Sequence, residues 1–319
     1  MSAPALDFGS LGFGAAGIGN LYRAVDDDAA AATIDAAWQG GIRYFDTAPH
    51  YGLGLSERRL GAFLRGKPRG EFLVSTKVGR LLVPRANPDD ARDDEGFDVP
   101  AAFRRVWDPS ESGIRRSLED SLARLGLDHV DILYLHDPDV FDLEAGITQA
   151  LPAMLRLRDE GLVRAVGVGA NSSKALAECV DRSELDVVML AGRYTLLEQP
   201  ALHDLLPACL ERGVGVVNVG VYNSGLLARA TVPDGANYNY APAPPDILDR
   251  ARRLARCCAE FGVKLPTAAL HFSLRHPAVR TVVVGASNAD QIEQNVARMR
   301  QTVPHELWGE LRRRGLIPE

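Results

Sequence analysis

The chain has 319 residues, of which 46% are hydrophobic and 24% are charged, and its formal net charge is -6. These values are typical of a soluble globular protein, and because no basic block is present they argue against a nucleic-acid partner. No apolar run approaches the ~18 residues of a membrane span, and no secretory leader is recognisable, so we expect a cytoplasmic protein with no membrane partner. The sequence gives no indication of oligomeric state.

Apolar runs alternate with amphipathic stretches along the whole chain. We expect strands at 11–17, 42–47, 72–78, 130–136, 164–170, 186–192, 214–220 and 280–286. Expected helices follow at 26–39, 56–65, 110–125, 146–160, 173–181, 200–212, 246–261 and 290–300. Continuous hydrophobic strands are typical of a parallel sheet covered by helices. Eight such units predict a single-domain (β/α)8 TIM barrel over residues 1–319, with a doubly wound open sheet as the alternative.

Two long segments interrupt this alternation, at 79–112 and 222–246, and an additional helix is expected within 266–279. Both segments are βα loops, which lie on the face where barrels carry their sites. Either they are disordered insertions or they are ordered loops that face the substrate. We expect ordered loops because they contain the aromatic residues Phe97, Phe103, Trp107, Tyr238 and Tyr240.

The segment "GFGAAG" matches the dinucleotide-binding pattern G-x-G-x-x-G through Gly12, Gly14 and Gly17. That pattern requires a preceding strand and a helix that opens within it, whereas the first expected helix begins only near Asp26. We therefore assign the glycines to the first barrel strand, where a missing side chain would let a cofactor or substrate come close.

Four polar residues follow consecutive strands. Asp46 ends the second strand and Tyr51 follows in its loop, while Lys77 and His136 lie at the ends of the next two strands. Taken singly, the aspartate could cap a loop, the lysine could be exposed, and the histidine could belong to the core. Because strand ends converge on one face of a barrel, the four together predict a catalytic site.

The chemistry of this set follows from its pKa values. A free tyrosine has a pKa near ~10, which is too high for a base at neutral pH, but a nearby ammonium lowers it. Asp46 would keep the buried Lys77 charged, Lys77 would lower the pKa of Tyr51, and His136 would orient the reacting oxygen. A tyrosine cannot carry hydride, so carbonyl–alcohol interconversion here implies a nicotinamide cofactor. The four cysteines (Cys179, Cys209, Cys257 and Cys258) are spaced as neither disulfides nor metal ligands, so we expect buried thiols and no metal.

The segments "YFDTAPHYGLGLSERRLG", "STKVGR" and "LYLHDPD" resemble the signature segments of the aldo-keto reductase superfamily. The resemblance runs from Leu11 to Ile317. It implies a barrel that binds NAD or NADP across the C-terminal ends of its strands. It also implies a catalytic tetrad of Asp46, Tyr51, Lys77 and His136.

The same resemblance implies the cofactor contacts. Asn171 matches the residue that holds the carboxamide, whereas Ala170 and Ala191 stand where a serine and a glutamine are usual. Tyr222 is the candidate for stacking on nicotinamide, with Val219 as the alternative. The remaining implied cofactor residues are Ser224, Gly225, Leu226, Gly285, Ala286, Ser287, Gln291, Gln294 and Asn295.

The cofactor is expected to be NAD rather than NADP. Gln291 and Gly285 stand where NADP-preferring members often carry arginine and lysine. Losing two cations removes charge-assisted contacts to a 2′-phosphate. The alternative is that Arg298 reaches the phosphate instead.

Three further segments, "GFGAAGIGNLY", "LLAGRYTLLEQ" and "VVNVGVYNSGLLA", resemble the branch containing L-fucose dehydrogenase, D-threo-aldose 1-dehydrogenase and pyridoxal 4-dehydrogenase. The branch implies oxidation of a cyclic hemiacetal to a lactone. The expected substrate is an aldose of the L-fucose, L-galactose or D-arabinose type. The alternatives are pyridoxal, general NADPH-dependent aldehyde reduction, and a scaffold role without turnover. The expected substrate-binding residues are Tyr22, His50, Trp107, Asp137 and Arg193.

Overall fold

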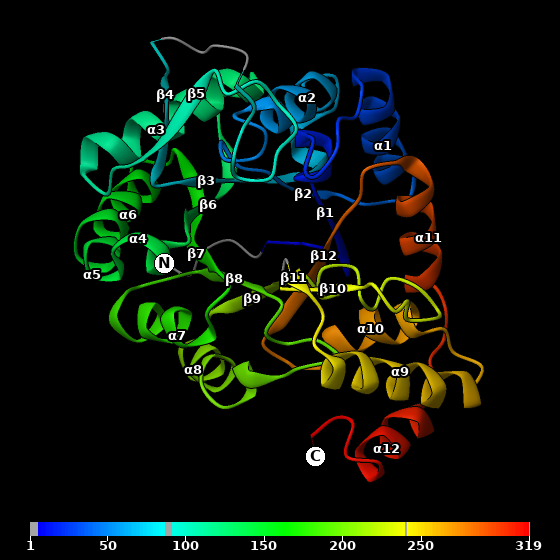
Figure 1. Ribbon diagram of the computed structural model, residues 1–319. Coiled ribbons are helices and arrows are strands. Elements are labelled where there is room, and N and C mark those ends of the chain that lie inside the picture. The colour runs from blue at the N-terminus through cyan, green and yellow to red at the C-terminus, as the bar shows by residue number, and fades with distance from the viewer. Residues whose placement is uncertain (1–5, 87–90, 240, 319) are drawn as a thin grey trace.

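A closed barrel of eight parallel strands lies at the centre of the computed structural model, which describes residues 6–86, 91–239 and 241–318 (Figure 1). In order around the barrel, the strands are β1 (Leu11–Gly14), β12 (Val279–Gly285), β9 (Gly215–Val219), β8 (Val187–Ala191), β7 (Val163–Ala170), β6 (Val130–His136), β3 (Leu73–Val78) and β2 (Tyr44–Asp46). This confirms the predicted (β/α)8 barrel and excludes the open sheet. The first strand is shorter than predicted because the chain leaves the barrel and forms a 3-10 turn at Gly17–Gly19.

Helices surround the barrel (Figure 1). The predicted helices correspond to α1 (Asp27–Gln39), α2 (Leu55–Leu64), α3 (Glu111–Leu125), α6 (Leu151–Asp159), α7 (Ser173–Arg182), α8 (Leu205–Arg212), α9 (Pro245–Glu260), α10 (Leu265–Ser273) and α11 (Ala289–Met299). Before α6 the chain forms α5 (Leu143–Ala145) and a π-helical turn, and before α8 it forms a separate 3-10 turn. The sequence did not predict α4 (Pro138–Phe141), which is about one turn long, or α12 (His305–Arg313), which packs outside the βα repeat against α9.

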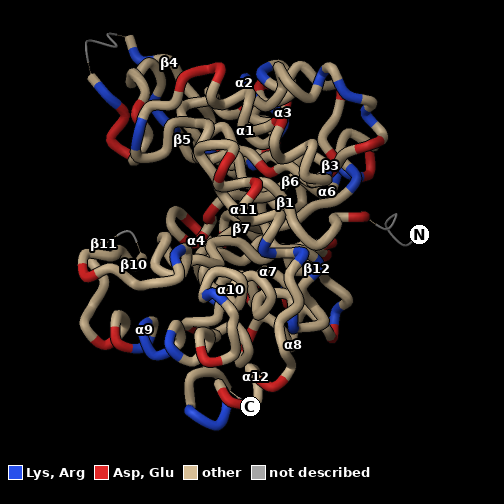
Figure 2. Tube along the Cα trace, turned by 90° about the vertical axis from the view of Figure 1, so that its right-hand side faces the viewer, with Lys and Arg blue, Asp and Glu red and all other residues tan. Residues whose placement is uncertain are grey.

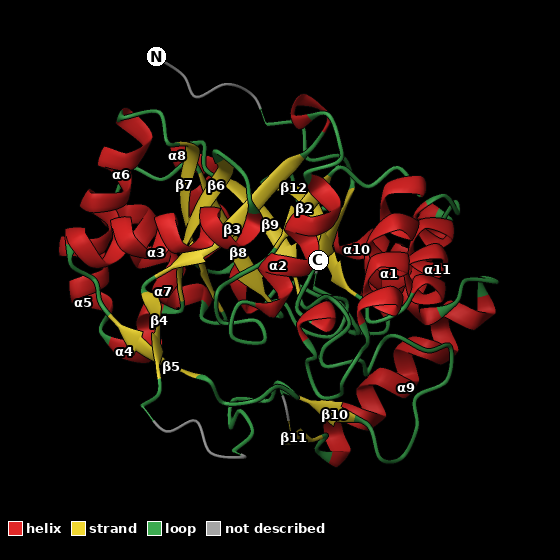
Figure 3. Ribbon diagram, turned by 90° about the horizontal axis from the view of Figure 1, so that it is seen from above, coloured by secondary structure: helices red, strands yellow, loops and turns green. Residues whose placement is uncertain are grey.

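The two interrupting loops each contain an antiparallel hairpin. One pairs β4 (Arg80–Pro84) with β5 (Phe103–Trp107), and the other pairs β10 (Asn237–Tyr238) with β11 (Ala241–Pro242). Figures 2 and 3 place both hairpins at one end of the barrel, opposite the N-terminal segment. Within the described residues both loops thus contain paired strands, whereas their facing the substrate stays a prediction, and Tyr240 lies outside these residues.

Side chains alternate between the inside of the barrel and the surrounding helices, as the pleat of a strand requires. Phe45 faces outward and stacks on Trp38 of α1, with ring centres 6.4 Å apart. Tyr44 faces inward and meets the edge of Phe8 at 5.0 Å. The cysteines are buried and unpaired, as expected.

Other residues of the protein occupy the space beside the glycines near β1. A Cβ at Gly12 would lie 2.8 Å from Cδ1 of Tyr44, and a Cβ at Gly17 would lie 2.3 Å from the carbonyl oxygen of Ala286. The prediction that these glycines admit a cofactor or substrate is therefore wrong at Gly12, where a barrel side chain fills the space, whereas Gly17 packs against a neighbouring backbone and also lines a cleft.

The described residues contain no group of three or more His, Cys, Asp or Glu side chains that could hold a metal ion. None of the helices in the same residues has the length and apolar content needed to cross a bilayer. In the view of Figure 2, basic and acidic residues are interspersed along the trace.

Candidate active site

The four residues of the predicted tetrad come from neighbouring strands. Asp46 ends β2, Lys77 is the penultimate residue of β3, and His136 ends β6. These strands are adjacent in the barrel, and Tyr51 lies in the turn that follows β2. The structure thus brings the four side chains to one end of the barrel.

Lys77 and Asp46 form a buried ion pair. The ammonium of Lys77 donates to Oδ2 of Asp46 at 2.6 Å and to the carbonyl of Thr47 at 2.9 Å, and the two side chains are 2% and 4% exposed. Burial acts to lower the pKa of Lys77, but Asp46 and the hydroxyl of Tyr51 outweigh it, so the pKa is raised above its ordinary value. Lys77 therefore stays charged at the base of the site.

Tyr51 is half-buried beneath the loop between β4 and β5. Phe97 of that loop stacks on its ring at 6.0 Å, and Nζ of Lys77 lies 4.6 Å from the ring centre. Burial raises the pKa of Tyr51, and the charge of Lys77 reduces the rise without reversing it. The predicted lowering of this pKa is therefore wrong for the protein alone, because the extent of burial depends on the fold.

His136 is held in its neutral form. Burial, followed by the positive charges of Arg80 and Lys77, lowers its pKa well below the ordinary value. His50 lies 5.5 Å away, between ring centres, and the same causes together with Arg105 lower its pKa to about 2. A neutral imidazole at position 136 can donate one hydrogen bond to a substrate oxygen without adding charge.

Of the predicted substrate-binding residues, His50 and Asp137 lie beside His136. Asp137 has a left-handed backbone, with φ of 45°, and its Oδ2 lies 3.5 Å from Nε2 of His136. The same oxygen accepts a hydrogen bond from Arg80 at 2.5 Å. Arg80 was missed, although it stands in the quoted segment "STKVGR", because an arginine after a strand is usually exposed.

Trp107 borders the same region. The ring of Trp107 stacks almost parallel on the ring of Phe141, with ring centres 5.0 Å apart. The guanidinium carbon of Arg80 lies 5.1 Å from the centre of the Phe141 ring. Of the nine buried side-chain polar atoms without a hydrogen-bond partner within the described residues, three are Nδ1 of His50, Nε of Arg80 and Nε1 of Trp107. Buried polar atoms of this kind are usually satisfied, so their grouping here favours a ligand.

A cleft of about 680 Å³ opens at the same end of the barrel, between the segments that follow β1, β9 and β12, and none of the tetrad residues lines it. Nine predicted cofactor residues line it: Tyr222, Ser224, Gly225, Gly285, Ala286, Ser287, Gln291, Gln294 and Asn295. Tyr22, predicted to bind substrate, lines this cleft instead, together with the unpredicted Arg229. Asn171 and Leu226 do not line it. Leu226 is buried beneath the loop, and Asn171 is exposed just after β7.

The cleft wall formed by α11 is held by polar contacts. The hydroxyl of Tyr222 donates to Oδ1 of Asn295 at 2.8 Å, and Arg298 donates to Asn295 at 2.8 Å and to Gln294 at 3.1 Å. Tyr222 thus points toward α11, and its stacking on nicotinamide stays a prediction. Arg23, which the sequence did not suggest, donates to Oγ of Ser287 at 2.7 Å.

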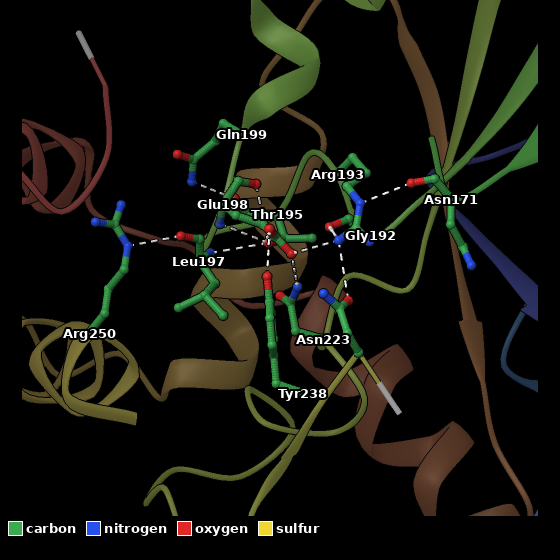
Figure 4. A network of polar contacts seen from close by, with 11 residues as sticks. Asn171, Gly192, Arg193, Thr195, Leu197, Glu198, Gln199, Asn223, Tyr238 and Arg250 are labelled. Carbon is green, nitrogen blue, oxygen red and sulfur yellow. Dashed lines mark hydrogen bonds and ion pairs between the residues drawn. The ribbon is translucent and has the colours of Figure 1, made fainter. Parts of the chain in front are cut away.

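Arg193 belongs to a network that ties three loops together (Figure 4). Its guanidinium donates to the carbonyl of Asn171 at 2.9 Å and to Oε1 of Glu198 at 3.1 Å. Glu198 also accepts from Asn223 at 3.0 Å and from the hydroxyl of Tyr238 at 2.8 Å. The structure therefore places Arg193 among protein partners rather than beside the tetrad. Glu198 was missed because its partners are distant in the sequence.

A scan against protein-family models matches residues 10–313 to the Aldo/keto reductase family. The chain belongs to this family. It is 50% identical to the D-threo-aldose 1-dehydrogenase of Pseudomonas sp., over 99% of this chain and 97% of that protein. It is 39% identical to the pyridoxal 4-dehydrogenase of Microbacterium luteolum, over 97% and 94% of the two chains.

Among solved structures, this aldo/keto reductase is similar to the holo form of the aldo-keto reductase AKR11C1 from Bacillus halodurans. The two share 28% identity with a TM-score of 0.75, over 97% of this chain and 92% of that one. The resemblance inferred from the sequence motifs, including the named branch, is thereby confirmed.

Proposed function

We propose that the protein is a nicotinamide-dependent aldose 1-dehydrogenase that oxidises the anomeric hydroxyl of an aldose to the lactone. The observation that carries the proposal is the 50% identity to a D-threo-aldose 1-dehydrogenase over nearly the whole chain. The buried pair of Lys77 and Asp46 beside Tyr51 supports it, because that arrangement suits proton exchange with a hydroxyl.

Each residue of the tetrad has a separate task in this proposal. Tyr51 takes the hydroxyl proton in oxidation and returns it in reduction. Neutral His136 donates a hydrogen bond to the reacting oxygen, and Lys77, held by Asp46, stabilises the deprotonated Tyr51. Since burial raises the pKa of Tyr51, oxidation should be favoured at alkaline pH.

The cleft at the same end of the barrel as the tetrad fits a dinucleotide. The N-terminus of α11 faces this cleft, and helix N-termini bind phosphate groups. Asn288 caps the helix by accepting a hydrogen bond from the backbone N–H of Gln291 at 3.0 Å. Tyr222, Ser224, Gly225, Ser287 and Asn295 would hold the cofactor. When bound, a nicotinamide supplies the hydride acceptor that no side chain can provide.

NAD is the proposed cofactor. The side chain of Gln291 accepts from the backbone N–H of Ser287 at 2.9 Å, so an uncharged group lies where a 2′-phosphate would want a cation. The guanidinium of Arg298 is already held by Asn295 and Gln294. NADP binding would have to draw on Arg23 or Arg298.

An aldose suits the polar groups around His136. A sugar presents several hydroxyls, and Asp137, His50 and Trp107 offer an acceptor and unpartnered polar atoms for them. Pyridoxal is the second candidate substrate, supported by the 39% identity to a pyridoxal 4-dehydrogenase. It presents fewer hydroxyls to these groups.

The test is a panel of L-fucose, L-galactose, D-arabinose and pyridoxal, each with NAD and NADP, read by absorbance of the reduced nicotinamide. We expect NADH formation with at least one aldose, and loss of about 10²–10⁴-fold in rate on Tyr51→Phe with retained NAD binding. Turnover of pyridoxal alone would favour the second substrate. Tight NAD binding without turnover of any compound, including simple aldehydes, would favour a scaffold.

A further inference from the structure

The three strands that carry the tetrad repeat one pattern two residues earlier. Asp46, Lys77 and His136 are preceded at that spacing by Tyr44, Ser75 and Tyr134. Residues two apart on a strand share a face, so these hydroxyl residues point into the barrel directly beneath the catalytic ones. We call Tyr44, Ser75 and Tyr134 the hydroxyl layer.

Hydrogen bonds connect this layer in series to Asp46. Oγ of Ser75 donates to Oδ1 of Asp46 at 2.7 Å, the oxygen that Lys77 does not use. The hydroxyl of Tyr44 lies 3.0 Å from that of Ser75 and 3.3 Å from that of Tyr134. No residue of the series is more than marginally exposed, since all three side chains of the layer are 0% accessible.

The direction of the series is fixed by its charged end. A carboxylate only accepts, so the single hydroxyl proton of Ser75 goes to Asp46. The oxygen of Ser75 is then free to accept from Tyr44, and the oxygen of Tyr44 to accept from Tyr134. Every O–H dipole of the layer consequently points its positive end toward Asp46.

The surroundings make these dipoles strong. Tyr44 and Tyr134 pack with Phe8, Leu73, Ile132 and other apolar residues inside the barrel. In such a medium electrostatic interactions are less screened than in water, and hydrogen bonds in series polarise one another. Burial raises the pKa of Asp46 above its ordinary value, although Lys77 and Ser75 oppose the rise.

The two phenols lie beside glycines of neighbouring strands. A Cβ at Gly12 would lie 2.8 Å from Tyr44, whereas a Cβ at Gly167 would first meet the carbonyl oxygen of Val187 at 2.0 Å and would lie 3.0 Å from Tyr134. Barrel interiors are usually filled with branched aliphatic residues. A glycine at position 12 that makes room for one of two hydrogen-bonded phenols favours a task beyond filling space.

We infer that Ser75, Tyr44 and Tyr134 are positioning residues that act through Asp46: their aligned hydroxyls hold it as the carboxylate that keeps Lys77 charged, and Lys77 in turn favours negative charge on Tyr51 above it. The inference rests on the proposed acid–base role of Tyr51. Removing a hydroxyl removes positive potential from the site, so the pKa of Tyr51 should rise. The charged or titratable groups that face Tyr51 and His136 from the surrounding elements are Asp46 and His50 (β2 and its turn), Lys77 (β3), Arg80 (β4), Arg105 (β5) and Asp137 (after β6).

The test reads the ionisation of residue 51 without any substrate. Replacing Tyr51 by 3,5-difluorotyrosine brings its ionisation nearer to neutral pH, and 19F NMR follows that one residue. We expect Ser75→Ala to raise this pKa by about one unit, Tyr44→Phe by roughly half a unit, and Tyr134→Phe by less, because the effect weakens along the series. Ser75→Thr, which keeps the hydroxyl, should retain the original value.

Thr76 provides the matched control. Its hydroxyl is equally buried and donates to Oε1 of Glu57 at 2.7 Å, on the opposite face of β3. Thr76→Val should lower the melting temperature without moving the ionisation of residue 51. If Ser75→Ala and Tyr44→Phe behave like Thr76→Val, the layer is only structural and the inference is overturned. Should Ser75→Ala fail to fold, the nearly isosteric Tyr44→Phe decides.

The substrate panel separates this inference from the proposed function. If an aldose is oxidised, the pKa of the acid limb in the pH profile of kcat/KM should rise in the same variants. If no aldose is oxidised, the proposed function fails, while the NMR titration still decides whether the hydroxyl layer controls residue 51.

Discussion

Nζ of Lys77 lies 2.6 Å from Oδ2 of Asp46, and both side chains are almost completely removed from solvent. Removing one partner of such a pair leaves a buried, uncompensated charge. We expect Asp46→Asn to reduce the free energy of unfolding by about 3–5 kcal/mol, measured by urea denaturation, and to abolish turnover because Lys77 loses its proton. The double variant Asp46→Asn/Lys77→Met should recover stability but not activity. Recovery of activity in the double variant would contradict the role of the pair.

The buried histidines make folding sensitive to acid. The pKa of His50 is about 2 in the folded protein, because of burial and then the neighbouring arginines, against 6.5 for the ordinary side chain. Between these two pH values the imidazole of His50 binds a proton in the unfolded chain but not in the folded one. The free energy of unfolding is therefore highest above about pH 6.5, as far as His50 is concerned, and it decreases as the pH falls below that value. One such group contributes a slope of at most about 1.4 kcal/mol per pH unit.

His50→Asn should therefore flatten the dependence of unfolding free energy on pH between 6.5 and 4. His305→Asn, at an exposed position of α12, is the control and should leave the slope unchanged. Chemical denaturation at a series of pH values measures both. An unchanged slope in His50→Asn would show that the imidazole is not held neutral.

The network around Glu198 predicts an effect on nucleotide exchange. Glu198→Gln weakens the contacts to Arg193, Asn223 and Tyr238, and Asn223 belongs to the loop that lines the cleft. Hydrogen bonds to a charged group are each worth about 1.5–3 kcal/mol, so we expect release of the nucleotide to accelerate roughly 10-fold in stopped-flow fluorescence. The control is Glu184→Gln, whose side chain is 84% exposed. Equal release rates in the two variants would argue against the network.

Substitutions at Gly17 and Gly285 should distinguish an effect on folding from an effect on nucleotide binding. A methyl group at Gly17 would meet the carbonyl of Ala286 at 2.3 Å, whereas one at Gly285 would meet nothing closer than 3.9 Å and would enter the cleft. We expect Gly17→Ala to cost about 1–3 kcal/mol of stability. Gly285→Ala should keep the melting temperature and weaken nucleotide binding in calorimetry. The opposite assignment of effects would refute the packing role of Gly17.

The strands of the barrel were predictable because each is a continuous apolar run, and the tetrad because it follows those strands in order. The partners of the tetrad were not predictable. Arg80 acts on Asp137, 57 positions away, and such a pairing becomes visible only when the two strand ends are placed side by side. The pKa of Tyr51 was mispredicted for a related reason. Its sign depends on whether burial or the charge of Lys77 is larger, and only the fold sets the burial.

Two loops from different parts of the chain border the candidate site. Phe97, on the loop between β4 and β5, covers Tyr51, while the Glu198 network holds the loop after β9 along the cleft. Neither loop includes residues of the other. Under the proposed function, entry of the substrate and departure of the nucleotide would therefore be controlled by separate loops.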